Sequence, residues 1–312
     1  MSIWVVAIVI LFSFHHAKAD FDLKCYLKDN CNGKSGGTSS NPSTGGQVKI
    51  NPSAVPTDAG YGIEGLFYKD EVDVALIRGT GRVGAAISPS NSDETFFGPP
   101  GFENTQDLYE RKRLAEKYPN QKYTLAAAMN VVDSRGSGLK SFNLKLGAMI
   151  KYNKLTQAFT PGAGFNGVLG PITFGASMYG DQTQLTDPYY GDAVKTLIKY
   201  QVQTYNVGIF LSSFILDYSH LKLEVLEDPN PAEVTLLTAS LLIDKFIITV
   251  AKRTEESQQL SYNYETKQLE QKLTKETYFG GVQYRVNKNI MLGLFNNYYM
   301  LREYSFSTTF FF

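Results

Sequence analysis

The stretch YSFSTTFFF, residues 304–312, decides the fold class of this chain. Successive side chains of a β-strand point to opposite faces, so the stretch has one aromatic face and one mainly hydroxyl face. The aromatic face consists of Tyr304, Phe306, Thr308, Phe310 and Phe312. The opposite face consists of Ser305, Ser307, Thr309 and Phe311. Because the end of a domain is usually loose and polar, this pattern predicts a strand whose outer face meets apolar surroundings.

The same alternation recurs along the chain from residue 61 onward. It is clearest in YTLAAAMNV (123–131), FNLKLGAMIKY (142–152) and YFGGVQYRV (278–286). In each stretch the side chains at alternate positions form a face that is mainly apolar. Such alternation indicates half-buried strands, and their length of about ten residues suits a tilted crossing of a bilayer. The predicted strands are 60–69, 71–79, 82–90, 121–133, 139–152, 158–168, 170–180, 198–210, 213–224, 233–242, 244–253, 277–286, 289–299 and 303–312.

The connections between these strands fall into two alternating sets. One set is always short and lies near Gly81, at 134–138, near Gly170, at 211–213, at Asp244 and at 287–289. The other set holds short connections near Asp70, at 153–157 and at 301–303, and all the long ones, 91–120, 181–197, 225–232 and 254–276. Outer-membrane barrels have short periplasmic turns and longer extracellular loops. We therefore predict an all-β fold, an antiparallel transmembrane β-barrel of fourteen strands. The number becomes twelve if 71–90 is one strand and 60–69 lies inside the lumen.

Residues 1–60 differ in composition from the rest of the chain. An apolar run followed by Ala17 and Ala19 predicts a secretory signal peptide over 1–19. An uncleaved anchor helix is the alternative, for which the apolar run is short. In an exported chain Cys25 and Cys31 are expected to form a disulfide. Residues 20–60 are rich in Gly, Ser, Thr, Asn and Pro, so we predict a flexible periplasmic segment before a barrel over 61–312.

Charge and motifs exclude several function classes. The 30 basic and 30 acidic residues balance, and no basic stripe indicates a nucleic-acid partner. His220 is the only histidine beyond residue 19, and alternation puts Asp217 and Ser219 on the face opposite to it. We therefore expect no catalytic, cofactor-binding or metal-binding set, and we interpret His220 as a rim or lipid-interface residue. A barrel hydrolase that pairs His220 with a distant acid is the alternative.

The chain resembles bacterial outer-membrane β-barrel proteins in its terminal nonapeptide and in its alternating strands. Inside a bilayer a sheet has to close on itself, so the last strand is expected to pair with the first. In these proteins the barrel-assembly machinery reads a terminal Phe. The resemblance implies location in the bacterial outer membrane, lipid contact, and an assembly signal made of Tyr304, Phe306, Phe310 and Phe312. The alternative is a buried strand in a soluble secreted domain.

A second, looser resemblance is carried by RGTGRVGAAISPSNSDETFFGPPGF, residues 78–102. This stretch is similar to the Gly/Ala-rich N-terminal portion of fatty-acid-transporter-type (FadL-like) barrels, with Ser-Pro-Ser at 88–90 where that family has Asn-Pro-Ala. The resemblance implies fourteen strands, an N-terminal segment that plugs the lumen, and a lateral route for hydrophobic substrates. No substrate-binding residue is transferred from that family.

Polar residues on the faces opposite the apolar rows are expected to point into the lumen, because a charge facing lipid at the bilayer midplane costs about 2–4 kcal/mol. These residues are Asn143, Lys145, Lys151, Gln283 and Arg285. They line either a passage or a closed interior in which they pair with one another. The segments 105–120, with a helical pattern, and 254–276 are both charged, and they either constrict the lumen or extend into solvent.

The function that these patterns favour is passive passage of small molecules, including hydrophobic ones, through the barrel lumen. The alternative is a structural or adhesive barrel whose surface loops bind an external partner. The expected partners are outer-membrane lipid, the barrel-assembly machinery and a small hydrophobic substrate.

Overall fold

The computed structural model describes residues 48–57, 59–67, 72–90, 122–134, 142–154, 156–186, 195–211, 213–225, 232–257, 261–263, 268–270, 273–287, 289–297 and 303–312. The predicted signal peptide, the cysteine pair and the helical pattern at 105–120 lie outside these residues. None of the helices described is long and apolar enough to span a membrane.

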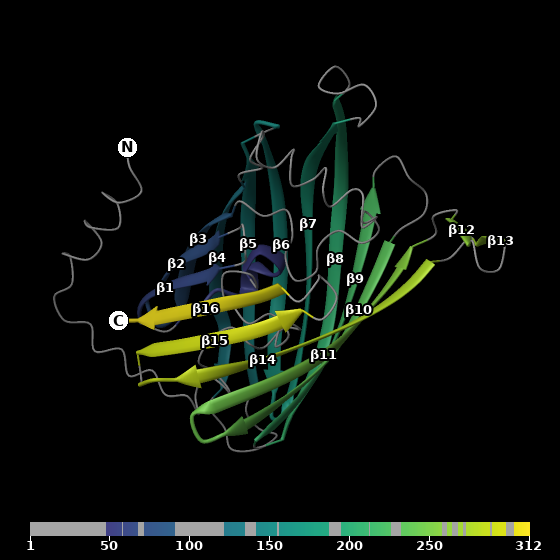
Figure 1. The fold of residues 1–312 in the computed structure, drawn as a ribbon. Coiled ribbons are helices and arrows are strands. Elements are labelled where there is room, and N and C mark those ends of the chain that lie inside the picture. Colours follow the sequence, from purple (N-terminus) through teal and green to yellow (C-terminus); the bar gives the residue numbers. More distant parts are fainter. Residues whose placement is uncertain are drawn as a thin grey trace.

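The described chain forms a closed antiparallel β-barrel of fourteen strands, as predicted (Figure 1). The barrel strands are β1 (Gly60–Phe67), β2 (Val72–Gly79), β3 (Val83–Ser90), β4 (Lys122–Ser134), β5 (Phe142–Asn153), β6 (Ala158–Leu169), β7 (Ile172–Thr186), β8 (Lys195–Leu211), β9 (Phe214–Val225), β10 (Ala232–Ile243), β11 (Phe246–Ser257), β14 (Leu273–Arg285), β15 (Ile290–Asn297) and β16 (Glu303–Phe311). A small separate hairpin, β12 (Ser261–Asn263) and β13 (Gln268–Glu270), lies between β11 and β14. A short 3-10 helix, η1 (Pro52–Ala54), precedes the barrel.

The first and last strands close the barrel. β1 and β16 pair antiparallel from Gly62 opposite Phe311 to Phe67 opposite Phe306. Beyond this ladder, the Tyr61 amide donates to the Phe312 carbonyl at 3.1 Å, and the Phe312 amide donates to the Tyr61 carbonyl at 2.9 Å. The alternative of twelve strands is wrong, because β1 is part of the wall and β2 and β3 are separate strands.

Tight turns gather at one rim, here called the short-turn rim. The turns at Gly81 and Gly170 need positive φ angles, +97° and +56°, which glycine adopts at little cost. At the opposite rim several strands extend beyond their predicted ends, β7, β8, β11 and β14 by three residues or more. β7 continues to Thr186 and β8 begins at Lys195, so most of the predicted loop at 181–197 is strand. An outer face beyond the bilayer needs no apolar row, so alternation gives little signal for these ends.

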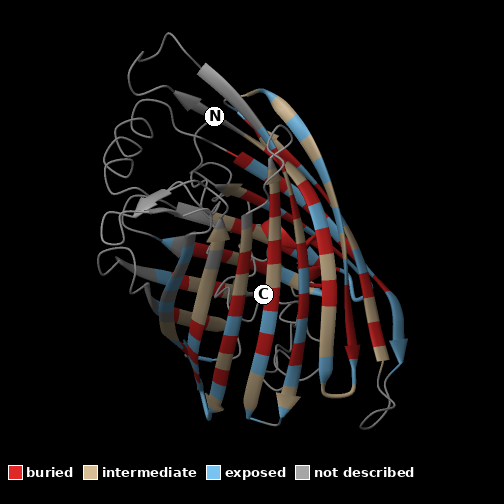
Figure 2. Cartoon of the chain, turned by 90° about the vertical axis from the view of Figure 1, so that its right-hand side faces the viewer, coloured by how far each residue is buried: buried red, intermediate tan, exposed pale blue. Residues whose placement is uncertain are grey.

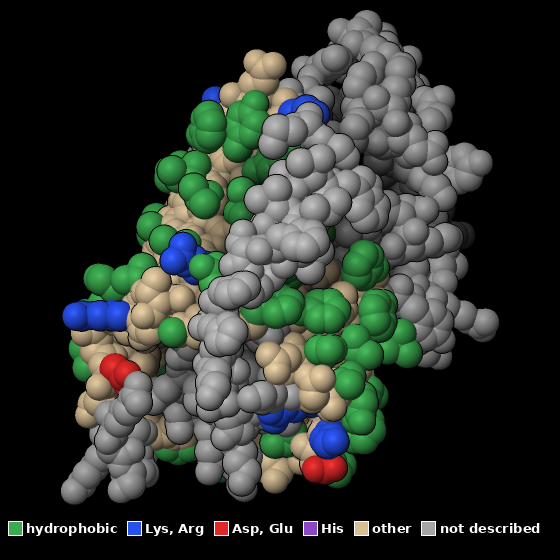
Figure 3. Space-filling model, turned by 90° about the vertical axis from the view of Figure 1, so that its left-hand side faces the viewer, with side chains coloured by type: hydrophobic (Ala, Val, Ile, Leu, Met, Phe, Trp, Pro, Cys, Tyr) green, Lys and Arg blue, Asp and Glu red, His purple; other side chains and the backbone are tan. Residues whose placement is uncertain are grey.

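The wall has an apolar outer face and a mainly small or polar inner face. Along β4 the burial alternates from Lys122 to Val131, with Leu125 57 % exposed outside and Ala126 2 % exposed inside. Figure 2 shows buried and exposed residues alternating along strands of the barrel. Figure 3 views the side on which β1, β2 and β3 lie in Figure 1, and hydrophobic side chains cover much of the described surface there. This pattern is the inverse of a soluble protein, and it is the pattern expected of a barrel whose outside meets lipid.

Candidate functional site

The lumen contains residues 48–57, here called the inner segment, which includes η1. In Figure 1 this purple segment lies inside the ring of strands, and Val48, Asn51, Ser53, Val55 and Thr57 are 0 % exposed. The segment packs against β4, β5 and β6. The expectation of a flexible periplasmic segment over 20–60 is therefore wrong for residues 48–57. Composition predicted flexibility because the stretch has few large apolar side chains, but Val48, Ile50 and Val55 belong to the buried hydrophobic core.

Three glycines of the wall provide the space for that backbone. A Cβ atom at Gly84 would collide with the Pro56 carbonyl, one at Gly147 with the Ser53 amide, and one at Gly164 with the Asn51 side chain. These glycines lie on β3, β5 and β6, at inward-facing positions of neighbouring parts of the wall. Glycine here permits close approach of two backbones, which is one of its uses within strands.

Hydrogen bonds fix the inner segment at both ends. Near the short-turn rim the Gly81 amide donates to the Thr57 carbonyl at 2.7 Å, and the Asn130 amide group donates to the Thr57 hydroxyl at 2.9 Å. Further up, the Ser177 hydroxyl donates to the Ile50 carbonyl at 2.8 Å. Such bonds satisfy backbone groups that are buried away from solvent.

Asn51 organises the turn in the middle of the inner segment. Its carboxamide oxygen caps η1 by accepting from the Ser53 amide at 3.1 Å and from the Ser53 hydroxyl at 2.7 Å. Its amide nitrogen donates to the Phe165 carbonyl of β6 at 3.3 Å. One side chain therefore both caps the short helix and attaches it to the wall.

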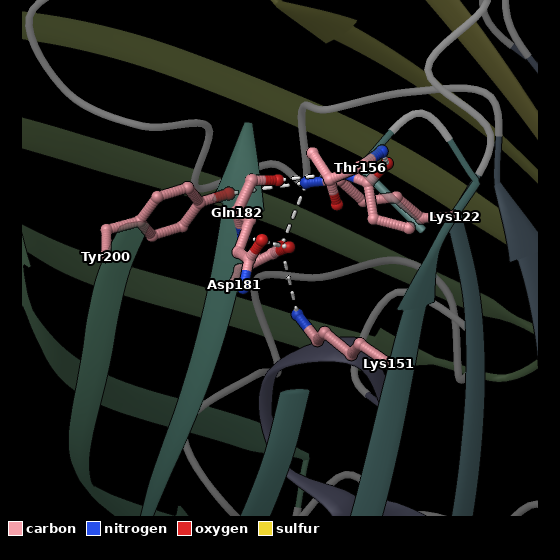
Figure 4. A network of polar contacts seen from close by, with 7 residues as sticks. Lys122, Lys151, Thr156, Asp181, Gln182 and Tyr200 are labelled. Atoms are coloured by element: carbon pink, nitrogen blue, oxygen red, sulfur yellow. Dashed lines mark hydrogen bonds and ion pairs between the residues drawn. The ribbon is translucent and has the colours of Figure 1, made fainter. Parts of the chain in front are cut away.

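Above the inner segment, toward the rim of the long loops, a charged network joins four strands (Figure 4). The Asp181 carboxylate lies 3.0 Å from the Lys122 ammonium and 3.7 Å from the Lys151 ammonium. Lys122 also donates to the Tyr200 hydroxyl at 3.3 Å, and the Lys151 ammonium lies 3.6 Å from the centre of the Tyr179 ring. All these side chains are at least nine-tenths buried. A buried ion group of this kind is stable only with its partners in place.

The pairing between strands is interrupted at two places in the wall. β2 and β3 pair at Asp73–Ser90 and again from Leu76–Ile87 onward, and Pro89, which has no amide hydrogen, lies in the interval. β6 and β7 pair only up to Gly162–Tyr179, although both strands continue toward the long-loop rim. At this second interruption the Asn153 side chain donates to the Gln182 carbonyl at 2.8 Å.

The part of the wall beyond β7, formed by β8, β9 and β10, has a different lining. In the half nearer the long loops, β8, β9 and β10 point apolar side chains inward, each 5 % exposed or less; they are Val202, Leu221, Leu223, Val234 and Leu236. Below them the inward positions of the same strands are polar and buried, as at Ser219, Thr238 and Ser240.

The structure places the predicted lumen residues as follows. Asn143, Lys145, Lys151 and Gln283 are each 6 % exposed or less on the inner face, whereas Arg285, at the short-turn rim, is half-buried and donates to the Asn287 carbonyl. Only Lys151 of this set belongs to the charged network. The sequence pattern does not single out Lys122 or Asp181. Lys122 lies two residues before the inward Thr124 and so has a signal in the alternation of β4, whereas Asp181 falls in a predicted loop.

The predicted outer and rim residues are also placed. Phe306 is 42 % exposed and Phe310 half-buried on the outer face of β16, with Ser307 and Thr309 buried inside. His220 lies on the outer face, 3.5 Å from the Thr235 hydroxyl, while Asp217 and Ser219 are buried on the inner face. The wall thus separates these three residues. Among the described residues, no group of His, Cys, Asp or Glu side chains has the arrangement of a metal site.

No family model and no curated protein matches this chain. Among solved structures, it is similar to OmpT, an outer membrane protein of Vibrio cholerae, in its in-vitro folded trimer form, with 8 % identity, a TM-score of 0.40, and coverage of 81 % of this chain and 97 % of that one. For the TodX deltaS2S3 mutant monoaromatic hydrocarbon channel the identity is 9 %, the TM-score 0.42 and the coverage 85 % and 92 %. For a bacterial polysaccharide outer membrane secretin the values are 13 %, 0.38, and 81 % and 97 %. At these values the likenesses carry no argument about substrate.

Proposed function

We propose that this chain is an outer-membrane channel that passes small apolar molecules by diffusion and releases them sideways through its wall. The observation that carries the proposal is the inner segment seated on Gly84, Gly147 and Gly164. A water-filled pore for polar solutes does not need a segment fixed inside it by close backbone contact. A channel that has to exclude polar solutes needs such a segment.

The lining of the lumen supports an apolar substrate. The inward side chains of β8 to β10 in the half nearer the long loops are apolar, among them Val202, Leu223 and Leu236. Each is 5 % exposed or less, so a molecule that enters from the long-loop rim reaches them only by displacing what packs against them. Deeper in, it meets buried polar groups and the inner segment. Apolar molecules gain free energy only while they stay in contact with apolar surface, so a path straight down to the periplasm is unfavourable.

The interruption between β2 and β3 supports a lateral exit. It lies beside inward positions with small side chains, Ala75, Ala86 and Ser88, and the outer face at this height carries Val74 and Ile87. A solute that passes here enters the hydrocarbon layer directly, without crossing the buried polar groups deeper in the lumen.

The location and assembly of the protein belong to the same proposal. The apolar outer face fits the bacterial outer membrane, with the short-turn rim in the periplasm and the long loops outside. The outward Phe306 and Phe310 of β16, which pairs with both of its neighbours, support a role for this strand in recognition by the barrel-assembly machinery.

The proposal is tested with two kinds of solute. Cells with an intact lipopolysaccharide layer exclude the apolar dye N-phenylnaphthylamine, and expression of this chain should raise the rate of dye entry. Purified protein in liposomes should cause no swelling with arabinose. Swelling with arabinose and no gain in dye entry would show a hydrophilic pore instead, and no change in either assay would favour the structural or adhesive alternative.

The lateral route is tested with a matched pair of variants on β3. Ala86 points inward beside the interruption and Ala85 points outward. Ala86→Trp should block dye entry while Ala85→Trp leaves it unchanged, with heat-modifiable gel migration confirming that both variants fold. Equal dye entry through both variants would contradict an exit at this place.

A further inference from the structure

The outer apolar band of the barrel has different heights on different sides. On β5 and β6 it runs the full strand, from Phe142 to Tyr152 and from Leu169 to Phe159. A strand tilted by about 40° advances roughly 2.6 Å per residue along the barrel axis, so the band here is roughly 26 Å high. It ends in an aromatic girdle, in which the Tyr152 ring lies 6.4 Å from that of Tyr123 and 4.7 Å from that of Phe159.

On the side of β8 to β11 the band stops far lower. Measured from the same short-turn rim, the last exposed large apolar side chain is Tyr205 on β8, Tyr218 on β9, Leu237 on β10 and Val250 on β11. By the same rise per residue the band is roughly 10–16 Å high. The next outward positions on these strands are polar; they are Gln203, His220, Thr235 and Lys252.

The polar side chains above this low band form a patch of mixed charge. The Lys222 ammonium lies 2.5 Å from the Glu224 carboxylate, and the Lys252 ammonium lies 2.6 Å from that of Glu276 on β14. His220 lies 3.9 Å from the Glu233 carboxylate. The paired Lys and Glu side chains stay between 34 % and 47 % exposed, so each keeps a large open surface.

The aromatic girdle follows the lower band. The Tyr205 hydroxyl donates to the Gln203 side chain at 3.2 Å, and the Tyr278 hydroxyl donates to the Glu276 carboxylate at 3.4 Å. In both cases the ring lies nearer the apolar band and the partner nearer the long loops. This is how tyrosine is placed where hydrocarbon meets lipid headgroups.

We propose that the outer wall of β8 to β11 is a contact surface for the phosphate-bearing headgroup layer of the outer leaflet, which descends there and thins the membrane on this side only. A second copy of the chain is the competing occupant. The core of a protein–protein interface is depleted of charged residues, whereas this patch consists largely of them. Its alternating charges match a layer that carries both phosphate and amine groups. The proposal depends on the barrel spanning a membrane, and it holds whatever solute the lumen passes.

The experiment compares two positions at similar height on β5 and β9, which lie four strands apart in the barrel wall. In a Trp4→Phe background, Ile150→Trp, His220→Trp and Leu216→Trp each introduce one indole. The probes are phosphatidylcholine vesicles with bromine at mid-chain, vesicles with a headgroup nitroxide, and acrylamide in the water. The ratio of headgroup to mid-chain quenching should exceed one at position 220 and fall below one at positions 150 and 216. The Leu216→Trp variant controls for the strand, because it lies on β9 inside the low band.

Other outcomes overturn the proposal. Mid-chain quenching at position 220 equal to that at position 150 would place hydrocarbon against the patch. An indole at 220 shielded from both lipid quenchers and acrylamide, with chain-to-chain cross-linking of Lys222→Cys, would identify a second copy. Because an introduced indole could itself draw lipid to the patch, nitroxide labels at Gln203→Cys and Ile150→Cys repeat the comparison. Oxygen should relax the label at 150 more strongly, and a water-soluble nickel chelate the label at 203.

Discussion

The walls β3 to β7 and β8 to β11 are built from the same alternating strands and carry different side chains on both faces. Inside, the first wall offers glycine and alanine to the inner segment and a buried ion group above it, while the second offers Val202, Leu221 and Leu236. Outside, the first wall is apolar up to Tyr152, while the second is apolar only up to Tyr218. Alternation therefore specifies which side chains face in or out, and the identity of those side chains specifies what each part of the wall contacts.

The buried acid of the first wall should matter far more than an exposed acid of the second. Asp181→Ala leaves Lys122 and Lys151 in a site whose side chains are less than a tenth exposed. Removing one partner of such a group typically costs about 3–5 kcal/mol in the free energy of unfolding. Urea unfolding of the barrel in lipid vesicles, followed by heat-modifiable gel migration, measures the loss.

Glu224→Ala is the matched control. Glu224 also lies against a lysine, at 2.5 Å, but its side chain is 37 % exposed on the outer face. Water and polar lipid headgroups replace the missing partner there, so the change in unfolding free energy should be much smaller. Equal losses for the two variants would mean that the two walls do not differ in solvent access, and the comparison would fail.

The second prediction concerns Gly84, Gly147 and Gly164, the glycines of the first wall against which the inner segment packs. Gly147→Ala puts a Cβ against the backbone of Pro52 and Ser53, which cannot rotate away. Overpacking of this kind costs about 1–3 kcal/mol, and displacement of the inner segment should expose an Ala54→Cys probe to a maleimide reagent. Gly180→Ala is the control, because the nearest atom to its new Cβ is that of Thr160 at 3.5 Å, an ordinary contact. If both variants label equally, the segment is not held by the close approach.

Much of the fold could be predicted from the sequence, because apolar and polar side chains alternate along each membrane strand. The fourteen strands, the closure of β16 on β1 and the sorting of turns and loops by rim all follow from that alternation. The inner segment could not be found in this way. Its burial depends on Gly84, Gly147 and Gly164, and glycine in a strand does not say what approaches it. Lys122, Lys151 and Asp181 come together only through the curvature of four strands, which no local pattern contains.

The third prediction compares two serines, one on each wall. The Ser177 hydroxyl contacts the Ile50 carbonyl of the inner segment and the Thr204 hydroxyl, while the Ser240 hydroxyl contacts only Thr249, at 2.9 Å, among the described residues. Both serine-to-alanine variants should lose about 1 kcal/mol of unfolding free energy. Only Ser177→Ala should raise labelling of the Ala54→Cys probe. Equal labelling in the two variants would show that this bond does not hold the segment.

The smallest expected effect has the opposite sign and concerns Ser88, beside the interruption between β2 and β3. Its side chain is 0 % exposed, and its hydroxyl has no hydrogen-bond partner among the described residues. A buried hydroxyl without a partner costs free energy, so Ser88→Ala should leave the unfolding free energy unchanged or raise it by up to about 1 kcal/mol. Ser240→Ala, which breaks a bond, should lower it. A destabilised Ser88→Ala variant would mean that the Ser88 hydroxyl has a hydrogen-bond partner in the membrane-embedded protein and that β2 and β3 are not separated there. Because the proposed exit needs the interruption between β2 and β3, that result would also count against the lateral route.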